Sequence, residues 1–306
     1  MTRRDTLLAV VVALVWGVNF LAIHASLASF PPLLLVAVRF TLLAVPTLLF
    51  VPRPDVPWKW VIGYGAGFGI AQFTFLYTGM AAGMPTGLAS LVLQASGPFT
   101  LVLGAVLLGE QVRRRQWLGL AIAAVGMSMV GVARAATAGA LPFILVLLGA
   151  LGWAFGNLSS RLARPSNPFT LVMWMSVVVP IPMLLLSLVF EGPQAIGTAL
   201  AGAVTAAAIP AWLGLAYTVL IGTIVGSGLW SMLLTRYSAG VVGPFSMLVP
   251  VVGMGTAAVV LGEIPQPLEL AGAALVVGGV LWGGRAPART AEPAAPGSEE
   301  LQAQPV

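Results

Sequence analysis

The sequence predicts an all-α integral membrane protein with ten transmembrane helices, arranged as two inverted five-helix repeats with both termini in the cytoplasm. Three observations lead to this prediction. The 306 residues are 59% hydrophobic and only 8% charged, ten apolar runs are long enough to cross a bilayer, and motifs of the first half recur in the second. A soluble chain carries about 25% charged residues. The natural solvent for this composition is therefore a bilayer.

The apolar runs define the expected spans in order. They lie at 7–28, 33–51, 60–81, 87–108, 116–133, 141–159, 169–190, 207–233, 240–261 and 268–284. Runs of about 18 to 25 residues suit helices that cross a hydrocarbon core of about 30 Å. We expect residues 1–136 to form the first five-helix unit and residues 137–284 the second. The tail at 285–306, rich in Ala, Pro and Glu, is typical of a disordered cytoplasmic segment.

Basic residues lie on one side of the predicted membrane. Twelve of the 14 fall at the N-terminus, in the loops after even-numbered spans, or after the last span: Arg3, Arg4, Arg53, Lys59, Arg113, Arg114, Arg115, Arg161, Arg164, Arg236, Arg285 and Arg289. The opposite loops hold only Arg134, and Arg39 lies within a span. This distribution follows the positive-inside rule and predicts a multi-pass protein of the cytoplasmic (inner) membrane, with an uncleaved first span.

An internal repeat predicts the inverted arrangement. The motif "LVLGAVLLGEQ" resembles "MGTAAVVLGEI", which aligns Glu110 with Glu263 at an offset of 153 residues. The pair Trp16 and Asn19 similarly resembles Trp153 and Asn157, at an offset of 137 with one residue of slippage. Five spans per half force the second half to enter the membrane upside down. Inverted repeats of this kind are typical of alternating-access carriers, whose binding site lies between the halves near mid-membrane.

The composition also excludes several classes of protein. Cysteine is absent and histidine occurs once, which argues against a disulfide framework, a thiolate nucleophile or a zinc site. We therefore expect no catalytic residues, no metal and no cofactor. The net charge of +5 comes from scattered basic residues, so it does not indicate nucleic-acid binding. The expected partners are a small-molecule substrate and the lipid bilayer, and the sequence leaves the oligomeric state open.

Several motifs resemble those of a known family. They are the "VWGVNF" start, the "RF" dipeptide of the second span, the paired "LGE" motifs, "GMPTGLASLVLQASGPFT" and "RYSAGVVGPFSMLVPVVG". Together they resemble the EamA branch of the drug/metabolite transporter superfamily, most closely the bacterial O-acetylserine/cysteine exporters. The resemblance covers residues 1–284 and implies export of small metabolites, such as amino acids and their derivatives. One departure is His24, where those exporters tend to carry lysine.

Polar side chains inside the spans are the candidate substrate-binding groups. Trp16, Asn19 and His24 share one helical stripe, and lipid offers no partner to an amide or an imidazole. The full candidate set is Trp16, Asn19, Arg39, Gln72, Gln94, Trp153, Asn157, Trp230 and Ser246. For Asn19 a hydrogen bond between helices is the alternative to a substrate contact. For His24 the alternatives are an interfacial side chain and a group that couples transport to protons.

Arg39 is the most informative candidate. A charge at a helix centre costs about 2.5 to 3.5 kcal/mol on insertion scales. Asp and Glu are missing from the middle of every predicted span, which leaves backbone carbonyls, water or an anionic group of the substrate as partners. The carboxylate of an amino acid fits the guanidinium fork in a bidentate manner. A structural arginine that snorkels or caps a helix end is the alternative.

The predicted function is export of small metabolites by alternating access, with an amino-acid-like substrate bound between the two halves. One alternative is a flippase for lipid-linked metabolites within the same superfamily. A membrane-embedded transferase is the other, although the absence of His/Asp clusters argues against it. We expect Pro98 and Pro250 to free carbonyls in mid-span, and Glu110 and Glu263 to be structural carboxylates at span ends.

Overall fold

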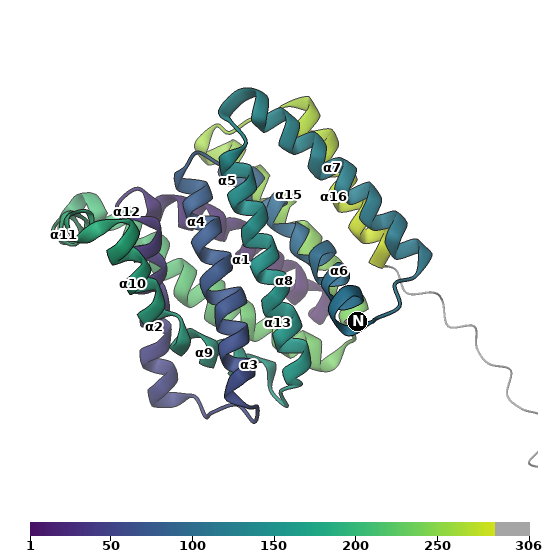
Figure 1. Cartoon of the computed structure of the whole chain (residues 1–306), viewed down its shortest axis with the longest axis horizontal. Helices are drawn as coiled ribbons and strands as arrows, with labels where there is room; N and C mark the ends of the chain where they lie inside the picture. Colours follow the sequence, from purple (N-terminus) through teal and green to yellow (C-terminus); the bar gives the residue numbers. More distant parts are fainter. Residues whose placement is uncertain (285–306) are drawn as a thin grey trace, which may run out of the picture.

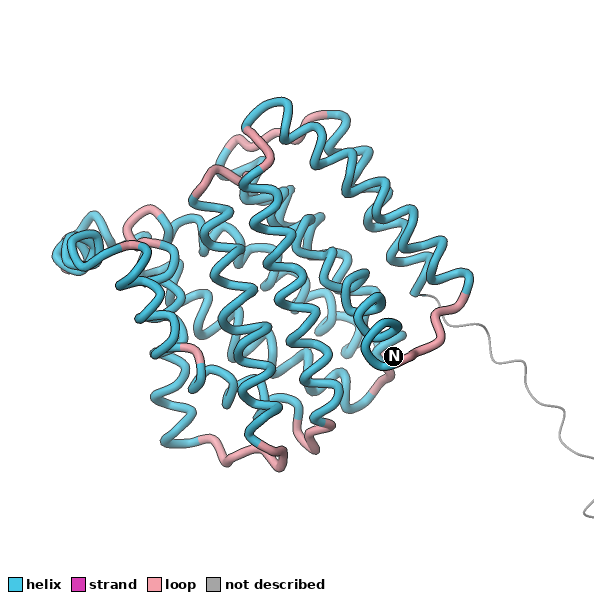
Figure 2. The backbone as a smooth tube through the Cα atoms, in the orientation of Figure 1, coloured by secondary structure: helices cyan, strands magenta, loops and turns pink. Residues whose placement is uncertain are grey.

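A computed structural model describes residues 1–284, and the predicted tail at 285–306 lies outside the described residues. All regular secondary structure within 1–284 is helical (Figure 2). The first half contains α1 (Arg3–Leu27), α2 (Pro32–Phe50), α3 (Trp58–Tyr64), η1 (Gly65–Gln72), α4 (Phe73–Ala81), α5 (Thr86–Val92), η2 (Leu93–Ala95), α6 (Ser96–Leu108) and α7 (Arg114–Ala138). The second half contains α8 (Leu141–Ala163), α9 (Pro168–Val178), α10 (Pro180–Phe190), α11 (Gly192–Ala203), η3 (Ala206–Ala208), α12 (Ile209–Ala216), η4 (Tyr217–Val225), α13 (Gly226–Arg236), α14 (Ala239–Val242), η5 (Gly243–Met247), α15 (Leu248–Leu261) and α16 (Pro267–Gly284).

Nine helical runs within residues 1–284 are long and apolar enough to cross a membrane. They correspond to nine of the ten predicted spans. The remaining run, predicted at 60–81, is helical from Trp58 to Ala81 through α3, η1 and α4. It falls outside the nine because its glycines and tyrosines, together with Gln72, lower its mean hydropathy. The structure therefore establishes a multi-span helical protein with nine clear candidate spans.

Large apolar side chains cover the outside of the bundle. Phe50 is 79% exposed and Val259 is 87% exposed, and similar residues recur along most of the long helices. In water such a surface would aggregate, whereas lipid tails solvate it. A second apolar set is buried between the helices and includes Tyr77, Phe40 and Leu35. The helices are thus apolar on both sides, as expected of spans packed in a bilayer.

Helices α7 and α16 form a pair set beside the main bundle (Figure 1). Their backbones approach closely at two glycine contacts. A Cβ atom at Gly126 would lie 2.5 Å from the carbonyl oxygen of Gly272, and one at Gly119 would lie 2.6 Å from that of Gly279. Small residues allow this approach, because helices in lipid associate through close packing and not through a hydrophobic driving force.

The segment between α10 and α12, for which the sequence predicts only a loop, contains the helix α11. Gly192 begins it with φ = +83°, a left-handed conformation that turns the chain sharply after α10. Pro193 then occupies the first turn, where a missing N–H costs little. Helix α11 lies beside α12 at the edge of the molecule (Figure 1), away from the centre of the bundle.

Candidate substrate-binding cavity

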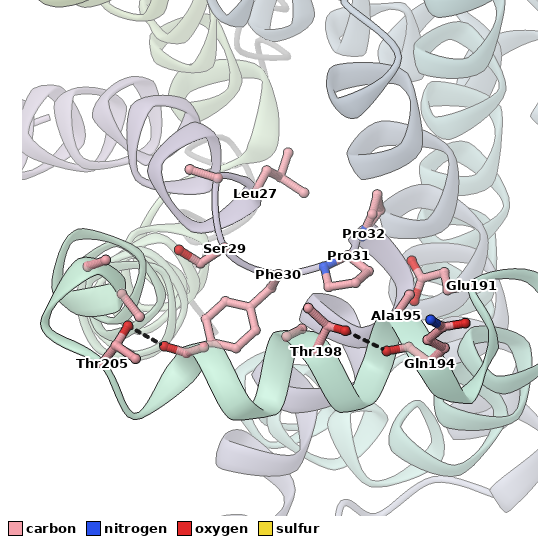
Figure 3. Close-up of a pocket in the computed structure, with 15 residues that line it drawn as sticks. Leu27, Ser29, Phe30, Pro31, Pro32, Glu191, Gln194, Ala195, Thr198 and Thr205 are labelled. Atoms are coloured by element: carbon pink, nitrogen blue, oxygen red, sulfur yellow. Dashed lines mark hydrogen bonds between the residues drawn. The ribbon is translucent and has the colours of Figure 1, made fainter.

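Two hollows in the described structure are candidate binding sites. The first, about 770 Å³, lies between α11 and the segment that links α1 to α2 (Figure 3). Its wall consists mostly of small side chains, and the hydroxyls of Thr198 and Thr205 donate to the carbonyls of Gln194 and Gly202. The second, about 420 Å³, lies in the centre of the bundle, and polar groups from both halves line it. We therefore take the central cavity as the candidate site.

The central cavity gathers all nine residues that the sequence singles out. Trp16, Asn19, Arg39, Gln72, Gln94, Trp153, Asn157, Trp230 and Ser246 all line it. They come from helices far apart in the chain, including α1, α2, α8 and α13. Their convergence is a structural fact, whereas substrate contact by each of them stays a prediction.

Arg39 lies on the cavity wall, 5% exposed, with no carboxylate beside it. Its Nη1 donates to the hydroxyl of Tyr77 at 2.8 Å, and its Nη2 donates to Oγ1 of Thr223 at 3.0 Å. The guanidinium also stacks over Phe73, with its central carbon 4.1 Å from the ring centroid. None of the ion pairs within residues 1–284 involves Arg39. This arginine is held by neutral groups, so its charge is not neutralised by the surrounding helices.

The π-helical segment η4 orients Thr223 toward Arg39. Oγ1 of Thr223 donates to the carbonyl of Thr218, five residues earlier, at 2.8 Å. Because that bond takes the hydroxyl proton, the oxygen lone pairs face outward and accept from the guanidinium. Such π-helical turns are often found at functional sites, where they re-aim a side chain. In the same way, η1 contributes Gln72 and Phe68 to the cavity.

Two 3₁₀ breaks, η2 and η5, meet at the middle of the bundle. Pro250 has no N–H, which leaves the carbonyl of Ser246, four residues earlier, without its helical partner. Nε2 of Gln94 donates to that carbonyl at 2.9 Å. The predicted mid-span effect of Pro250 is thus visible as a bond between the two halves. Pro98 follows η2 in a similar position and removes the helical partner of the Gln94 carbonyl.

Aromatic rings form much of the remaining wall. Trp16 and Trp230 pack with their ring planes tilted by 52° and centroids 5.2 Å apart, and Trp153 packs edge-on against Phe68 at 5.7 Å. The indole N–H of Trp16 donates to the carbonyl of Gly222 at 3.0 Å. These rings therefore present apolar faces to the cavity, which suits the aliphatic part of a small metabolite.

The amide side chains differ in how their hydrogen bonds are satisfied. Asn157 donates to Oγ1 of Thr100 at 3.1 Å, so it links α8 to α6. Oδ1 of Asn19 and Oε1 of Gln72 are buried without a hydrogen-bond partner among the described residues, as is Nε of Arg39. A buried polar atom left unpaired costs about 1 to 3 kcal/mol. Water or a substrate that reached these atoms would recover that energy.

His24 lies away from the cavity, near the end of α1. Its side chain is exposed, and Nδ1 lies 3.1 Å from Oγ1 of Thr86 at the start of α5. The interfacial side chain and the proton-coupling group therefore both stay predictions for His24.

The cavity reaches one end of the bundle, here called the N-terminal end because α1 begins there. Its lining extends to Pro168, the first residue of α9, and to Leu234, close to the end of α13. At the opposite end, here called the far end, hydrogen bonds tie the helices together. Both carboxylate oxygens of Glu263 accept from the amides of Thr86 and Gly87, each at 3.0 Å. The described conformation is therefore closed at the far end.

Sequence reasoning missed several residues in and behind the cavity wall that the structure reveals. Tyr77 and Thr223, which hold Arg39, are a tyrosine and a threonine in apolar runs, where such residues are common. The pattern alone contains no signal that distinguishes them. Phe68 lies within "GYGAGFG", whose glycines pack against α8 and α9, as tight packing predicts. Within residues 1–284, no three His, Cys, Asp or Glu side chains cluster as a metal site would require.

Helical spans around a polar central cavity are the architecture expected of a polytopic membrane transporter. The EamA-like transporter family matches residues 5–132 and again residues 140–283. The chain therefore belongs to the EamA-like transporter family.

Relatives and a solved structure agree with this assignment. A protein of Salmonella typhimurium named "Probable amino-acid metabolite efflux pump" is 41% identical over 92% of this chain and 94% of its own length. A protein of Escherichia coli with the same name is 39% identical over the same shares. A crystal structure with 22% identity has a TM-score of 0.61, covering 92% of this chain and 98% of its own, and shares the fold.

These findings make the chain a multi-pass transporter of the inner membrane that exports small metabolites. The family and its relatives are transporters and not enzymes, so a membrane-embedded transferase has no support among them.

Proposed function

We propose that the protein exports amino acids and their derivatives, such as cysteine and O-acetylserine, by alternating access. The observation that carries this proposal is Arg39, a cation in the cavity wall without a carboxylate partner in the described structure. A substrate carboxylate supplies the missing charge and can bond to the fork in a bidentate manner. The names of the two efflux pumps support the same substrate class.

The remaining groups of the cavity suit the other parts of an amino acid. The unpaired oxygens of Asn19 and Gln72 are acceptors for an ammonium group once it reaches them. The indole faces of Trp16 and Trp230 accommodate an apolar or thiol side chain. Gln94 and Ser246 join the two halves at the same depth, so they respond directly to any movement between the halves.

Ten spans with both termini in the cytoplasm are the topology that we propose. The run from Trp58 to Ala81 is the tenth span, because it is continuous and helical. The positive-inside rule then assigns the N-terminal end of the bundle to the cytoplasm. The cavity reaches that end, so the described conformation corresponds to an inward-facing state that loads substrate from the cytoplasm.

Two inverted repeats are the proposed domain organisation, and irregular helix geometry supports it. The π-helical segments Gly65–Gln72 and Tyr217–Val225 lie at nearly the same offset of 153 residues that relates Glu110 to Glu263. The 3₁₀ breaks Leu93–Ala95 and Gly243–Met247 also correspond approximately at this offset. The two successive matches to one family are consistent with it. Related halves provide the two equivalent packings that alternating access requires.

Transport measurements test the proposal. The purified protein is reconstituted in proteoliposomes, and counterflow of labelled cysteine and O-acetylserine is measured under reducing conditions, with an imposed proton gradient and without one. We expect counterflow that unlabelled amino acids inhibit and that amino-acid amides, which lack the carboxylate, do not. Equal inhibition by acids and amides would contradict recognition of the carboxylate. Counterflow of neither compound would contradict the proposed substrates.

A further inference from the structure

The two "LGE" glutamates have the same local backbone and different partners. Gly109 and Gly262 both adopt the left-handed conformation, with φ of +67° and +69°. The amides of Glu110 and Glu263 each bond to the carbonyl six residues earlier, at 3.3 Å in both cases. The turns are therefore equivalent, and any difference between the two carboxylates arises from what surrounds them.

That difference follows the two ends of the bundle. At the closed far end, Glu263 accepts hydrogen bonds from the first amides of the helical run Thr86–Leu108. At the N-terminal end, which the cavity reaches, Glu110 instead forms an ion pair with Arg161 of α8. The carboxylate of Glu110 lies over Gly104, where a side chain would collide with it.

The repeat offset identifies the missing partner of Glu110. Thr86 and Gly87 correspond, at 153 residues, to Ala239 and Gly240. These residues begin the helical run that continues to Leu261. The first amides of a helix have no intrahelical acceptor and attract a carboxylate. Glu110 thus has a second possible set of donors, equivalent to the set that Glu263 already uses.

A second pair of acidic residues shows the same asymmetry. At the far end, Glu191 accepts from the amides of Leu33 and Leu34, at 2.6 and 3.0 Å. Asp55 lies 136 residues earlier, at the offset that relates Pro32 to Pro168, and it accepts from the amide of Ser166, at 3.2 Å, in the loop before α9. This bonding with Ser166 lowers the pKa of Asp55 from its ordinary value, so Asp55 is ionised at neutral pH. The carboxylates at the closed end accept from the first amides of a helical run, and their counterparts at the other end do not.

We propose that Glu263 and Glu110 are alternating latches of the transport cycle, an inference that rests on the proposed inverted repeat. In the described state Glu263 holds the far end closed, while Arg161 holds Glu110 away from its helix. In the opposite state Glu263 releases Thr86 and Gly87, and Glu110 leaves Arg161 to bond to the amides of Ala239 and Gly240. Arg161 therefore competes with the amides of Ala239 and Gly240 for the carboxylate of Glu110.

Cysteine labelling can test this exchange, because the chain contains no cysteine. Gly97 lines the cavity, and a Cβ atom there would meet nothing within 4 Å, so Gly97→Cys adds a reporter thiol without a clash. A membrane-impermeant maleimide is applied from outside to right-side-out vesicles, and the rate of labelling reports the outward-facing fraction. Glu263→Gln should raise this rate on the order of tenfold, because a hydrogen bond to a charged group has about that effect on a two-state equilibrium.

Glu110→Gln and Arg161→Gln distinguish a latch from an ordinary ion pair. Both variants break the same ion pair, so a purely structural role predicts that labelling changes in the same direction. The latch predicts opposite directions. Arg161→Gln frees Glu110 to close the N-terminal end and raises external labelling, whereas Glu110→Gln removes the latch and lowers it. The double variant should behave as Glu110→Gln alone.

Two outcomes would overturn the latch, namely equal directions for the two single variants, or no effect of either. Protection of the Gly97→Cys thiol from the maleimide is measured in the same vesicles with O-acetylserine, a proposed substrate that has no thiol of its own. Protection together with equal directions would refute the latch and leave the proposed function intact. A thiol that is labelled from neither side would contradict both the proposed cavity and the latch. Counterflow of each variant shows that the protein under test is folded.

Discussion

Replacing Arg39 with methionine tests the proposed role of the central cation. The substitution removes the guanidinium and keeps an apolar side chain of similar length at a position that is 5% exposed. The neighbours tolerate this change. Oγ1 of Thr223 keeps its bond to the carbonyl of Thr218, and Tyr77 loses a donor and keeps its own hydroxyl proton. Since a buried charge is replaced by an apolar group, we expect little loss of stability.

The effect on binding should be much larger. No carboxylate within residues 1–284 pairs with the guanidinium, so a bound substrate carboxylate would lose its charged partner. A bidentate, charge-assisted contact of this kind contributes about 3 kcal/mol, because hydrogen bonds to charged groups contribute about 1.5 to 3 kcal/mol each. Affinity for the free acid should then fall on the order of 100-fold.

Counterflow in proteoliposomes measures this loss as a shift in the concentration of unlabelled cysteine that gives half-maximal exchange. Arg53→Met is the matched control, because Arg53 stacks on Trp58 outside the cavity lining. An amino-acid amide, which lacks the carboxylate, should be bound equally by the wild type and by Arg39→Met. Unchanged exchange of the free acid by a correctly folded Arg39→Met variant would refute the carboxylate contact.

Three further predictions concern the support around the cavity. Thr223→Val removes an acceptor of the guanidinium and should weaken exchange about tenfold, whereas Thr223→Ser should retain it; equal loss in both variants would contradict the hydrogen-bond role. Gln94→Leu removes the donor to the carbonyl of Ser246 and should lower the thermal unfolding temperature in detergent as well as the exchange rate. Gln94→Met, which also lacks the donor and keeps an unbranched side chain, should lower the unfolding temperature by a similar amount, and an unchanged temperature in both variants would contradict the bond between the halves. Gly126→Val places side-chain atoms against the backbone of Gly272. We expect this substitution to lower the thermal unfolding temperature by several degrees, because the α7–α16 contact is lost. Gly97→Ala, which adds a methyl group in open space, should leave the unfolding temperature unchanged.

Much of the fold could be predicted from apolar runs and breakers. The observed helices begin and end within a few residues of most predicted spans, since each run must satisfy its own backbone hydrogen bonds in lipid. Two features escaped prediction. Helix α11 is an amphipathic segment too short to register as a span. The π-helical segment from Gly65 to Gln72 depends on packing of α3 and α4 against α8, which no local pattern specifies.

The nine candidate residues could be chosen from sequence because a polar group within an apolar run has few explanations. The partners of those residues could not. Arg39 was expected to meet carbonyls, water or substrate, and the structure adds the hydroxyls of Tyr77 and Thr223. Thr223 is 184 residues away along the chain, and its hydroxyl points at Arg39 only because of a π-helical turn. The direction of such a side chain depends on helix rotation, which composition does not determine.

The sequence by itself determined the solvent of this protein, its helical class and the set of polar groups that lipid could not accommodate. These properties follow from composition and periodicity, because the hydrophobic effect and backbone hydrogen bonding act on each span separately. The tertiary structure alone decided which end is closed. After equivalent turns, Glu263 accepts hydrogen bonds from two helix amides, whereas Glu110 forms an ion pair with Arg161. The end of the bundle that is closed therefore depends on contacts between helices that are distant in the sequence.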